Sequence, residues 1–206
     1  MNLRALREAL WWAVDDGTNA ADLEVLTSGM DIRLINEALT DLADCLQITK
    51  YNNVLTPNPQ GVVTLPTDVY EVERVKWGGA DLKHVDNVHK IDADPSIQLV
   101  SSYMHTGRTT LQLYGTPAPP FSAFDLWYKA YPVLLINDTD EPVEVPTEFR
   151  LPLATVYARA RFLDKMDTDK RLAQHLLGAW FMFKKQLRGA VDARQRPSAY
   201  TGKWMW

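Results

Sequence analysis

The sequence of 206 residues contains one cysteine and has no excess of positive charge. Cys45 alone cannot form a disulfide within the chain or supply a thiolate cage for a metal ion. Lys and Arg number 22 against 26 Asp and Glu, so the formal net charge is −4. A protein that coats nucleic acid by charge alone has the opposite balance. With only 10 Gly and 12 Pro, the chain is neither collagen-like nor of low complexity.

Long hydrophobic runs are also missing. Its uncharged stretches are shorter than the roughly 20 apolar residues that a membrane-spanning helix needs. The first residues, Met1 to Asp16, are charged and amphipathic and lack the apolar centre of a signal peptide. At 46% hydrophobic and 23% charged residues, the composition is that of a globular chain with a packed core. We therefore expect a soluble protein that does not enter a membrane.

Helical spacing of apolar residues marks the amino-terminal part. One helix is predicted from Leu3 to near Asp15, and a clearer one over residues 31–46, with Asp31 placed to cap its exposed amides. Between them, residues 19–28 form a short predicted helix closed by Gly29.

The carboxyl-terminal part also predicts helices. The first begins near Thr147, with Pro152 confined to its early turns. Asp167 or Thr168 caps the second, which continues to about Ala193. The remaining residues have no periodicity, so we expect an extended arm.

The centre of the chain predicts strands. Gly78-Gly79 is typical of a tight hairpin turn. No helix of ten or more residues separates the later strands, which favours antiparallel pairing. The predicted strands are 62–65, 71–77, 97–104, 109–114 and 124–131.

Together these patterns predict an α+β fold. The helices from both ends pack into one bundle, and the centre forms a small antiparallel β-sheet or sandwich. The expected segments are 1–56 (helices), 57–135 (strands), 136–193 (helices) and 194–206 (arm).

Two groups of side chains could bind a metal ion. His84 and His89 lie near four aspartates, and such ligands suit several divalent ions. However, a spacing of five residues brings the two histidine rings together neither on one face of a helix nor on one side of a strand. A polar linker is therefore the better interpretation. The acidic loop Asp138–Glu144 does not have the glycine and the terminal glutamate of a Ca²⁺ loop at the required spacing, so a solvated loop is the better interpretation. The aspartates are Asp81, Asp86, Asp92 and Asp94.

Catalytic signatures are missing as well. Cys45 lies at the end of an apolar stripe with no nearby histidine, which indicates a buried, inert thiol. The sequence contains no nucleophile elbow, Walker loop or dinucleotide-binding turn. We expect neither an enzyme nor a cofactor.

The carboxyl-terminal residues combine basic and aromatic side chains. Between Lys184 and Lys203 there are six basic residues and one acidic residue, Asp192, and two tryptophans follow. Three interpretations remain open: docking on a partner, for which Trp, Tyr and Arg are enriched; nucleic-acid binding by stacking and phosphate contacts; or a frayed terminus. The candidate docking residues are Arg194, Arg196, Tyr200, Lys203, Trp204 and Trp206.

The order of several segments resembles the head-to-tail adaptor (connector, or head-completion) proteins of tailed bacteriophages, especially short-tailed ones. The resemblance covers about residues 30–190 and depends on apolar spacing rather than on a chemical signature. The segments are Ile35–Ala43 (INEALTDLA), Leu65–Val75 (LPTDVYEVERV) with Gly78-Gly79, Leu111–Tyr114 (LQLY), Leu126–Pro132 (LWYKAYP), an acidic loop, Val145–Phe149 (VPTEF) and Tyr157–Ala160 (YARA).

This resemblance implies a structural virion protein at the head-tail interface, assembled in the host cytoplasm. It implies a dodecameric ring beneath the portal that extends the DNA channel, lets DNA pass without specific binding, and joins the tail nozzle or tail tube. It also implies a carboxyl-terminal arm that reaches onto the portal. Two alternatives stay open: a DNA-binding accessory protein that uses the basic arm, and an enzyme with an unfamiliar site around His84, His89 or Cys45.

Overall fold

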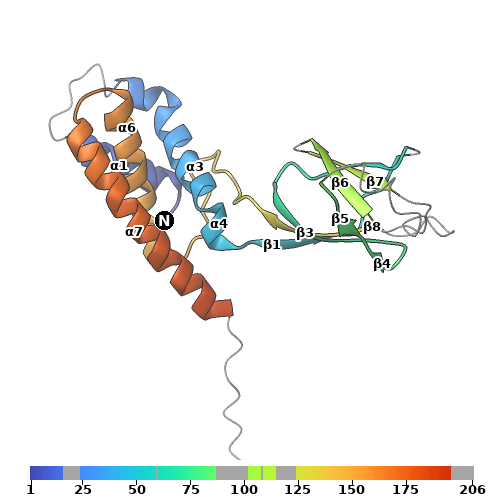
Figure 1. The fold of residues 1–206 in the computed structure, drawn as a ribbon. Coiled ribbons are helices and arrows are strands. Elements are labelled where there is room, and N and C mark those ends of the chain that lie inside the picture. The colour runs from blue at the N-terminus through green and yellow to red at the C-terminus, as the bar shows by residue number, and fades with distance from the viewer. Residues whose placement is uncertain (16–23, 59, 87–101, 108, 115–123, 196–206) are drawn as a thin grey trace, which may run out of the picture. The chain divides into compact units, whose positions relative to one another are not determined.

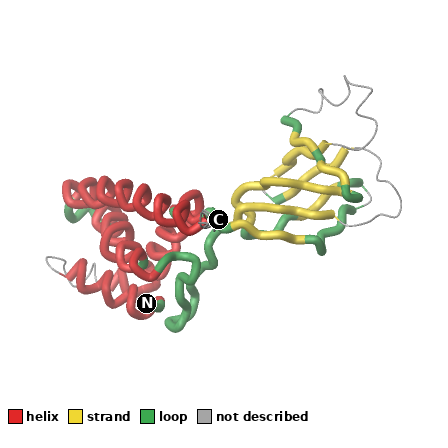
Figure 2. Tube along the Cα trace, turned by 90° about the horizontal axis from the view of Figure 1, so that it is seen from below, coloured by secondary structure: helices red, strands yellow, loops and turns green. Residues whose placement is uncertain are grey.

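The structure is a computed structural model that describes residues 1–15, 24–58, 60–86, 102–107, 109–114 and 124–195. The chain divides into two compact units. Residues 1–47 and 132–206 form the helical unit, and residues 48–131 form the β unit. In Figures 1 and 2 the described helices belong to the first unit and the described strands to the second. The predicted α+β fold, with amino- and carboxyl-terminal helices in one body, is confirmed.

The helical unit follows the predicted order with several breaks. Residues 31–46 form two helices rather than one, because the amide of Leu42 turns back to the carbonyl of Leu39 at 3.1 Å and tightens the chain there. The elements are α1 (Leu3–Asp15), the π-helical turn η1 (Leu26–Met30), α3 (Asp31–Asp41), α4 (Ala43–Leu46), the 3₁₀ turn η3 (Thr147–Phe149), the π-helical turn η4 (Leu153–Ala158), α6 (Arg159–Lys165) and α7 (Lys170–Gln195).

The structure corrects the predicted end of the last helix, and it describes only part of the short helix predicted over residues 19–28. Helix α7 continues to Gln195, so the arm does not begin at Arg194. Of the short helix predicted over residues 19–28, residues 19–23 lie outside the described residues, and η1 occupies the end of that segment.

The core of the helical unit is apolar and comes from both ends of the chain. Helix α3 packs against η4, α1 packs against α3 and η4, and α6 packs against α7. Fully buried side chains come from α1, α3 and the α6 region, including Leu6, Leu10, Leu34, Leu39 and Phe162. The apolar residues that recur with the helical period of 3.6 residues in the sequence are therefore the ones on the buried faces of these helices.

The described residues of the β unit form two four-stranded sheets. One has the order β1-β8-β3-β4 and the other β2-β7-β6-β5. Among the described strands, all pairs are antiparallel except β5 with β6, which is parallel and corrects the expectation of a purely antiparallel arrangement. The strands are β1 (Thr49–Asn52), β2 (Val62–Thr64), β3 (Val69–Trp77), β4 (Ala80–Asp81), β5 (Lys83–His84), β6 (Ser102–Gly107), β7 (Thr110–Tyr114) and β8 (Phe124–Ala130).

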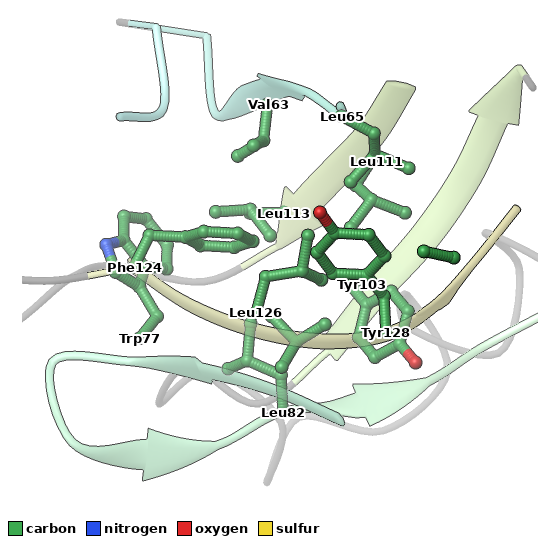
Figure 3. Packing of buried hydrophobic residues seen from close by; sticks show 12 residues of the cluster. Val63, Leu65, Trp77, Leu82, Tyr103, Leu111, Leu113, Phe124, Leu126 and Tyr128 are labelled. Carbon is green, nitrogen blue, oxygen red and sulfur yellow. The ribbon is translucent and has the colours of Figure 1, made fainter. Parts of the chain in front are cut away.

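Alternating side chains from the strands form the core of this unit (Figure 3). Along β8, Phe124, Leu126, Tyr128 and Ala130 are buried while the residues between them are partly exposed. This is the period of two that the sequence predicts for a half-buried strand.

The predicted Gly78-Gly79 turn is confirmed between β3 and β4. Trp77 pairs with Ala80, so the two glycines form the whole connection. Their φ angles are 57° and 83°, as a two-residue hairpin turn of this hand requires.

Candidate partner-docking site at the end of α7

The middle of α7 is fixed to α3 and α4 by polar contacts. The Trp180 indole Nε1 donates to Asp41 Oδ2 at 2.7 Å. One turn later, Lys184 Nζ donates to the Asp41 carbonyl at 2.8 Å and lies 3.2 Å from Asp44 Oδ1. Burial lowers the pKa of Lys184, but the carboxylates of Asp41 and Asp44 outweigh it and raise that pKa. Lys184 is therefore a charged structural residue.

An aromatic cluster lies beside these polar contacts. The rings of Trp180 and Phe183 stack at a centroid distance of 4.8 Å, and Tyr157 of η4 lies 5.0 Å from Trp180. Phe149 of η3 lies 5.6 Å from Phe183. Such pairs add packing energy beyond the area they bury. The cluster therefore holds α7 against η3 and η4.

The last two turns of α7 are held in the same way. Leu187 and Val191 are buried. Asp192 accepts a hydrogen bond of 3.4 Å from the Gln47 side chain, and Arg194 donates to Glu148 Oε1 at 2.8 Å. The helix is thus attached to the unit up to its final turn, and this fixes the position from which the remaining residues continue.

The structure places one of the six predicted docking residues. Arg194 lies in the last turn of α7, exposed and paired with Glu148. The other five, Arg196, Tyr200, Lys203, Trp204 and Trp206, lie outside the described residues.

The basic residues near this end differ in what they contact. Lys184 and Arg194 are paired with carboxylates of the same chain. Lys185 Nζ lies over the ring of Phe181 at 4.7 Å. A cation that is already paired with a carboxylate neutralises fewer phosphates and therefore displaces fewer counterions from a nucleic acid, so these contacts reduce the charge that this segment offers to phosphates.

Cys45 is a buried thiol beside a carboxylate. Its Sγ donates to Asp44 Oδ1 at 3.4 Å. Burial, with the negative charge of Asp44, raises the pKa of this thiol to about 11. The reactive thiolate is therefore scarce at neutral pH, as expected of an inert cysteine.

A cleft of about 500 Å³ lies in the β unit, lined in part by His84, His105, Tyr103, Tyr70 and Tyr131. The two histidine rings are 5.4 Å apart. Burial and the neighbouring His84 lower the pKa of His105, which is neutral at pH 7. Sequence reasoning singled out His84 but missed His105, although the latter follows Tyr103 by the strand period of two.

The predicted metal candidates do not assemble in the described residues, where no group of three suitable ligands occurs. His84 lies 3.4 Å from Asp86, while His89, Asp92 and Asp94 are outside the described residues.

The acidic loop is used for structure. The Asp140 carboxylate accepts the backbone amides of Asn137 and Ile136, each at 2.8 Å, and these bonds lower its pKa. Hydrogen bonding to Arg150 lowers the pKa of Glu141, and Asp138 pairs with Arg7. Asp138, Asp140 and Glu141 are therefore occupied by partners within the helical unit, whereas Glu144 Oε2 is buried without a hydrogen-bond partner among the described residues.

The family model of the SU10 adaptor protein matches residues 1–203. The chain belongs to this family. The resemblance read from about residues 30–190 is confirmed and extends over almost the whole chain. A search of the curated proteins found no match.

Membership in the SU10 adaptor family makes the chain a structural adaptor protein of a bacteriophage, with portal and tail proteins as its general partners and the head-tail junction as its place in the virion. The family is not an enzyme family. No helix among the described residues is long and apolar enough to cross a membrane.

Proposed function

We propose that the protein forms a dodecameric ring beneath the portal of a short-tailed phage. The ring extends the DNA channel and presents a platform to the tail nozzle or tail tube. Subunits assemble in the host cytoplasm onto the filled head, and DNA passes through without specific binding. Family membership supports the general adaptor role. A ring needs two different complementary faces on each subunit, since a single self-complementary face gives only a closed pair.

We further propose that the carboxyl-terminal arm docks the ring on the portal. The observation that carries this proposal is the fixed end of α7, where Arg194 is bonded to Glu148 and Asp192 to Gln47. Residues 196–206 follow that fixed point. Fully extended, they would span about 36 Å at about 3.3 Å per residue. This is enough to cross a subunit boundary. Trp204 and Trp206 would be the apolar anchors, and Arg196 and Lys203 would supply steering.

The test is portal binding by a chain that ends at Gln195. We expect the truncated protein to melt at the same temperature as the full chain and to lose portal binding. A full-length W204A/W206A variant should lose most of the affinity, whereas the matched variant S198A/T201A should keep it. Unchanged portal binding by the truncated chain would remove the arm from the docking mechanism.

Native mass spectrometry tests the ring. We expect a monomer or small oligomer for the free protein and a ring when portal is present, because the template raises the local concentration of subunits. A closed dimer under both conditions would contradict the ring. DNA affinity that depends steeply on salt and disappears with the arm would favour the DNA-binding alternative instead.

A further inference from the structure

The cleft in the β unit contains two histidines on adjacent strands. His84 is on β5 and His105 is on β6, and the centres of their rings lie 5.4 Å apart. Both residues are exposed, so solvent and solutes reach them. Neither the family match nor the proposed ring gives these two side chains a role. We call them the histidine pair.

Strand pairing places both imidazoles on one side of their sheet. His84 is opposite Tyr103 in the parallel pairing of β5 with β6. Tyr103 and His105 are two residues apart on β6, and alternate residues of a strand lie on the same face. The histidine pair therefore shares the face from which Tyr103 enters the core of the β unit (Figure 3).

The separation of the two rings is that of two imidazoles bound to one metal ion. A histidine nitrogen binds Zn²⁺ at about 2.0–2.1 Å, which places the centre of the ring about 3.2 Å from the ion. Two such rings at the tetrahedral angle have centres about 5.2 Å apart. The observed distance is 5.4 Å. Rotation of the two side chains, without movement of either strand, is therefore sufficient to bind an ion between them.

A carboxylate lies beside one of the two rings. His84 Nδ1 is 3.4 Å from Asp86 Oδ1. Histidines that bind a metal ion commonly use one ring nitrogen to contact a carboxylate, which fixes the ring and leaves the other nitrogen for the ion. Asp86 in this way leaves Nε2 of His84 for an ion.

Tyr103 restricts both histidines. The centre of its ring lies 5.2 Å from that of His84 and 6.1 Å from that of His105. Tyr103 is only 6% exposed, so its own position is fixed by the core. Side chains that are held by packing lose little freedom when they bind, which favours a preorganised site.

We propose that the histidine pair binds one divalent transition-metal ion, such as Zn²⁺ or Ni²⁺, and that this ion joins β5 to β6. Imidazole suits these ions, whereas Mg²⁺ and Ca²⁺ prefer oxygen ligands. The described residues contain no group of three suitable ligands, so water completes the coordination in the cleft of about 500 Å³. Glu71 also lines the cleft, but its carboxylate is bonded to Lys129 Nζ at 2.6 Å and is not assigned to the ion.

The ion would strengthen a short edge of the sheet. Among the described strands β5 lies at the edge, and it has two residues. Two residue pairs connect it to β6, and the Val85 amide donates to the Tyr103 carbonyl at 2.9 Å. Residues 85–104 separate His84 from His105 in the sequence. A metal ion that closes a loop of this length restricts the unfolded chain and so stabilises the folded state.

The first test is calorimetric titration of the full chain with ZnCl₂, after a chelator has removed bound metal. We expect one ion per chain. His84→Ala and His105→Ala should each weaken binding by at least about tenfold. His175→Ala is the matched control, because His175 is exposed on α7 in the helical unit, and it should bind as the unchanged chain does.

Two results of the titration would overturn the proposal. Equal binding by all four proteins would show an adventitious ion only. Loss of binding in His84→Ala but not in His105→Ala would assign the ion to His84 and to ligands other than His105.

The second test uses the unmodified sequence and therefore does not depend on the folding of a variant. Nuclear magnetic resonance follows the ring nitrogens of each histidine while Zn²⁺ is added. We expect the signals of His84 and His105 to change together up to one equivalent of Zn²⁺, while those of His175 stay in place. A change at one member of the pair without the other would overturn the proposal.

The third test measures the link between the strands by hydrogen exchange. At a Zn²⁺ concentration one hundred times its dissociation constant, the Val85 amide should exchange up to about one hundredfold more slowly, because opening of β5 must release the ion. The Leu3 amide, which donates to the Asp140 carbonyl in the helical unit, is the internal reference. Unchanged exchange of the Val85 amide in the presence of Zn²⁺ would show that the ion does not join the strands.

This inference does not depend on the proposed ring. Failure of the free protein to bind Zn²⁺ would overturn the inference and leave the adaptor role intact. Conversely, a protein that binds Zn²⁺ through the histidine pair but never assembles on portal would contradict the ring and support the inference.

Discussion

The buried carboxylate of Asp31 joins α1 to α3. It is 0% exposed. Its Oδ2 accepts hydrogen bonds from Arg7 Nε at 2.7 Å and Trp11 Nε1 at 3.2 Å, and its Oδ1 accepts the Ile32 amide at 2.8 Å. The hydrogen bond to Asp31, opposed by burial, raises the pKa of Arg7. Three donors satisfy this carboxylate, so its burial is compatible with a stable fold.

We expect Asp31→Ala to lower the free energy of unfolding by about 3–5 kcal/mol, since removing one partner of a buried ion pair leaves uncompensated polar groups. Asp31→Asn should cost less, because its amide oxygen can still accept hydrogen bonds. Urea unfolding followed by tryptophan fluorescence measures both. Arg33→Ala, which breaks only an exposed pair with Glu37, is the control and should change stability little. Equal losses in Arg33→Ala and Asp31→Ala would contradict this view.

We expect Cys45 to resist alkylation in the folded protein. With a pKa of about 11, the thiol remains protonated at pH 8, and only its thiolate reacts with iodoacetamide. Mass spectrometry should find Cys45 unmodified at pH 8 and fully modified in 8 M urea. Because the fold raises this pKa, its contribution to stability is full below the unfolded value of 9.0 and declines as pH rises toward 11. Rapid labelling of the native protein at pH 8 would show that the thiol is accessible.

The contacts of a residue could be predicted from the sequence only where its partners lie close to it in the chain. The sequence predicts Asp31 as the cap of a helix, and this is wrong: Asp31 is the first residue of α3, Met30 occupies the cap position without a side-chain hydrogen bond, and the backbone amide that the Asp31 carboxylate bonds is that of the next residue, Ile32. Its other partners, Arg7 and Trp11, are 24 and 20 residues away in the chain. Arg194 and Glu148 are 46 residues apart. Local spacing carries no information about such pairs, since they depend on how the helices pack.

Element types were predictable where the hydrophobic period is long and regular. β7 and β8 alternate as expected, and the buried faces of α1 and α3 follow the helical period. β1 was missed because its four residues, Thr49–Asn52, are polar or exposed and become a strand by pairing with β8. β5 has only two residues, too few for any period to show its parallel pairing. The predicted strand 97–104 is found later, at Ser102–Gly107, with residues 97–101 outside the described set.

Replacing the two glycines of the β3–β4 turn should change the stability of the protein by amounts that depend on the new residue. Both have φ in the left-handed region, where a Cβ costs about 1–2 kcal/mol per residue. Gly79→Ala should therefore lower stability by about that amount, although its Cβ would meet nothing within 4 Å. Gly78→Asn should be nearly neutral, because asparagine tolerates this geometry at the first turn position. Thermal unfolding compares the two variants, and equal melting temperatures would count against a conformational origin.

At the scale of the whole molecule, the β unit is an insertion in the helical unit. Residues 48–131 interrupt the segments 1–47 and 132–206. The first and last parts of the β unit lie side by side, since the Ala130 amide donates to the Ile48 carbonyl at 2.8 Å. Inserted domains with neighbouring ends are often removable.

We expect a chain in which residues 48–131 are replaced by a short Gly-Ser linker to retain a folded helical unit. Polar and apolar contacts of that unit, such as Trp180 with Asp41 and Asn36 with Leu135, come from outside the deleted segment. Far-ultraviolet circular dichroism should show helices with a cooperative melt. The isolated segment 48–131 should give a β spectrum. A deletion chain without cooperative melting would show that the two units depend on each other for stability.

The candidate docking surfaces were only partly visible before the structure. The basic and aromatic composition near the carboxyl terminus singles out Arg194 and the residues after it, but not the pairing of Arg194 with Glu148. The exposure of Gly178 on α7 could not be predicted, because a glycine within a helical pattern gives no sign of whether it faces the core or solvent. Burial of Trp180 and Phe183 settles that question.

The hydrogen bond between Ile48 and Ala130 also has a consequence for the order of folding. Helices α1, α3 and α4 must meet η4, α6 and α7 across a long intervening segment, and closing a flexible loop of that length costs about 4 kcal/mol in chain entropy. If the β unit folds first, pairing of β1 with β8 brings the two ends together and removes this cost before the helices meet. A destabilising substitution in the β-unit core, such as Leu126→Ala, should then slow the folding of the helical unit, although Leu126 is not part of that unit. Folding of the β unit would then set the rate at which the helical unit folds.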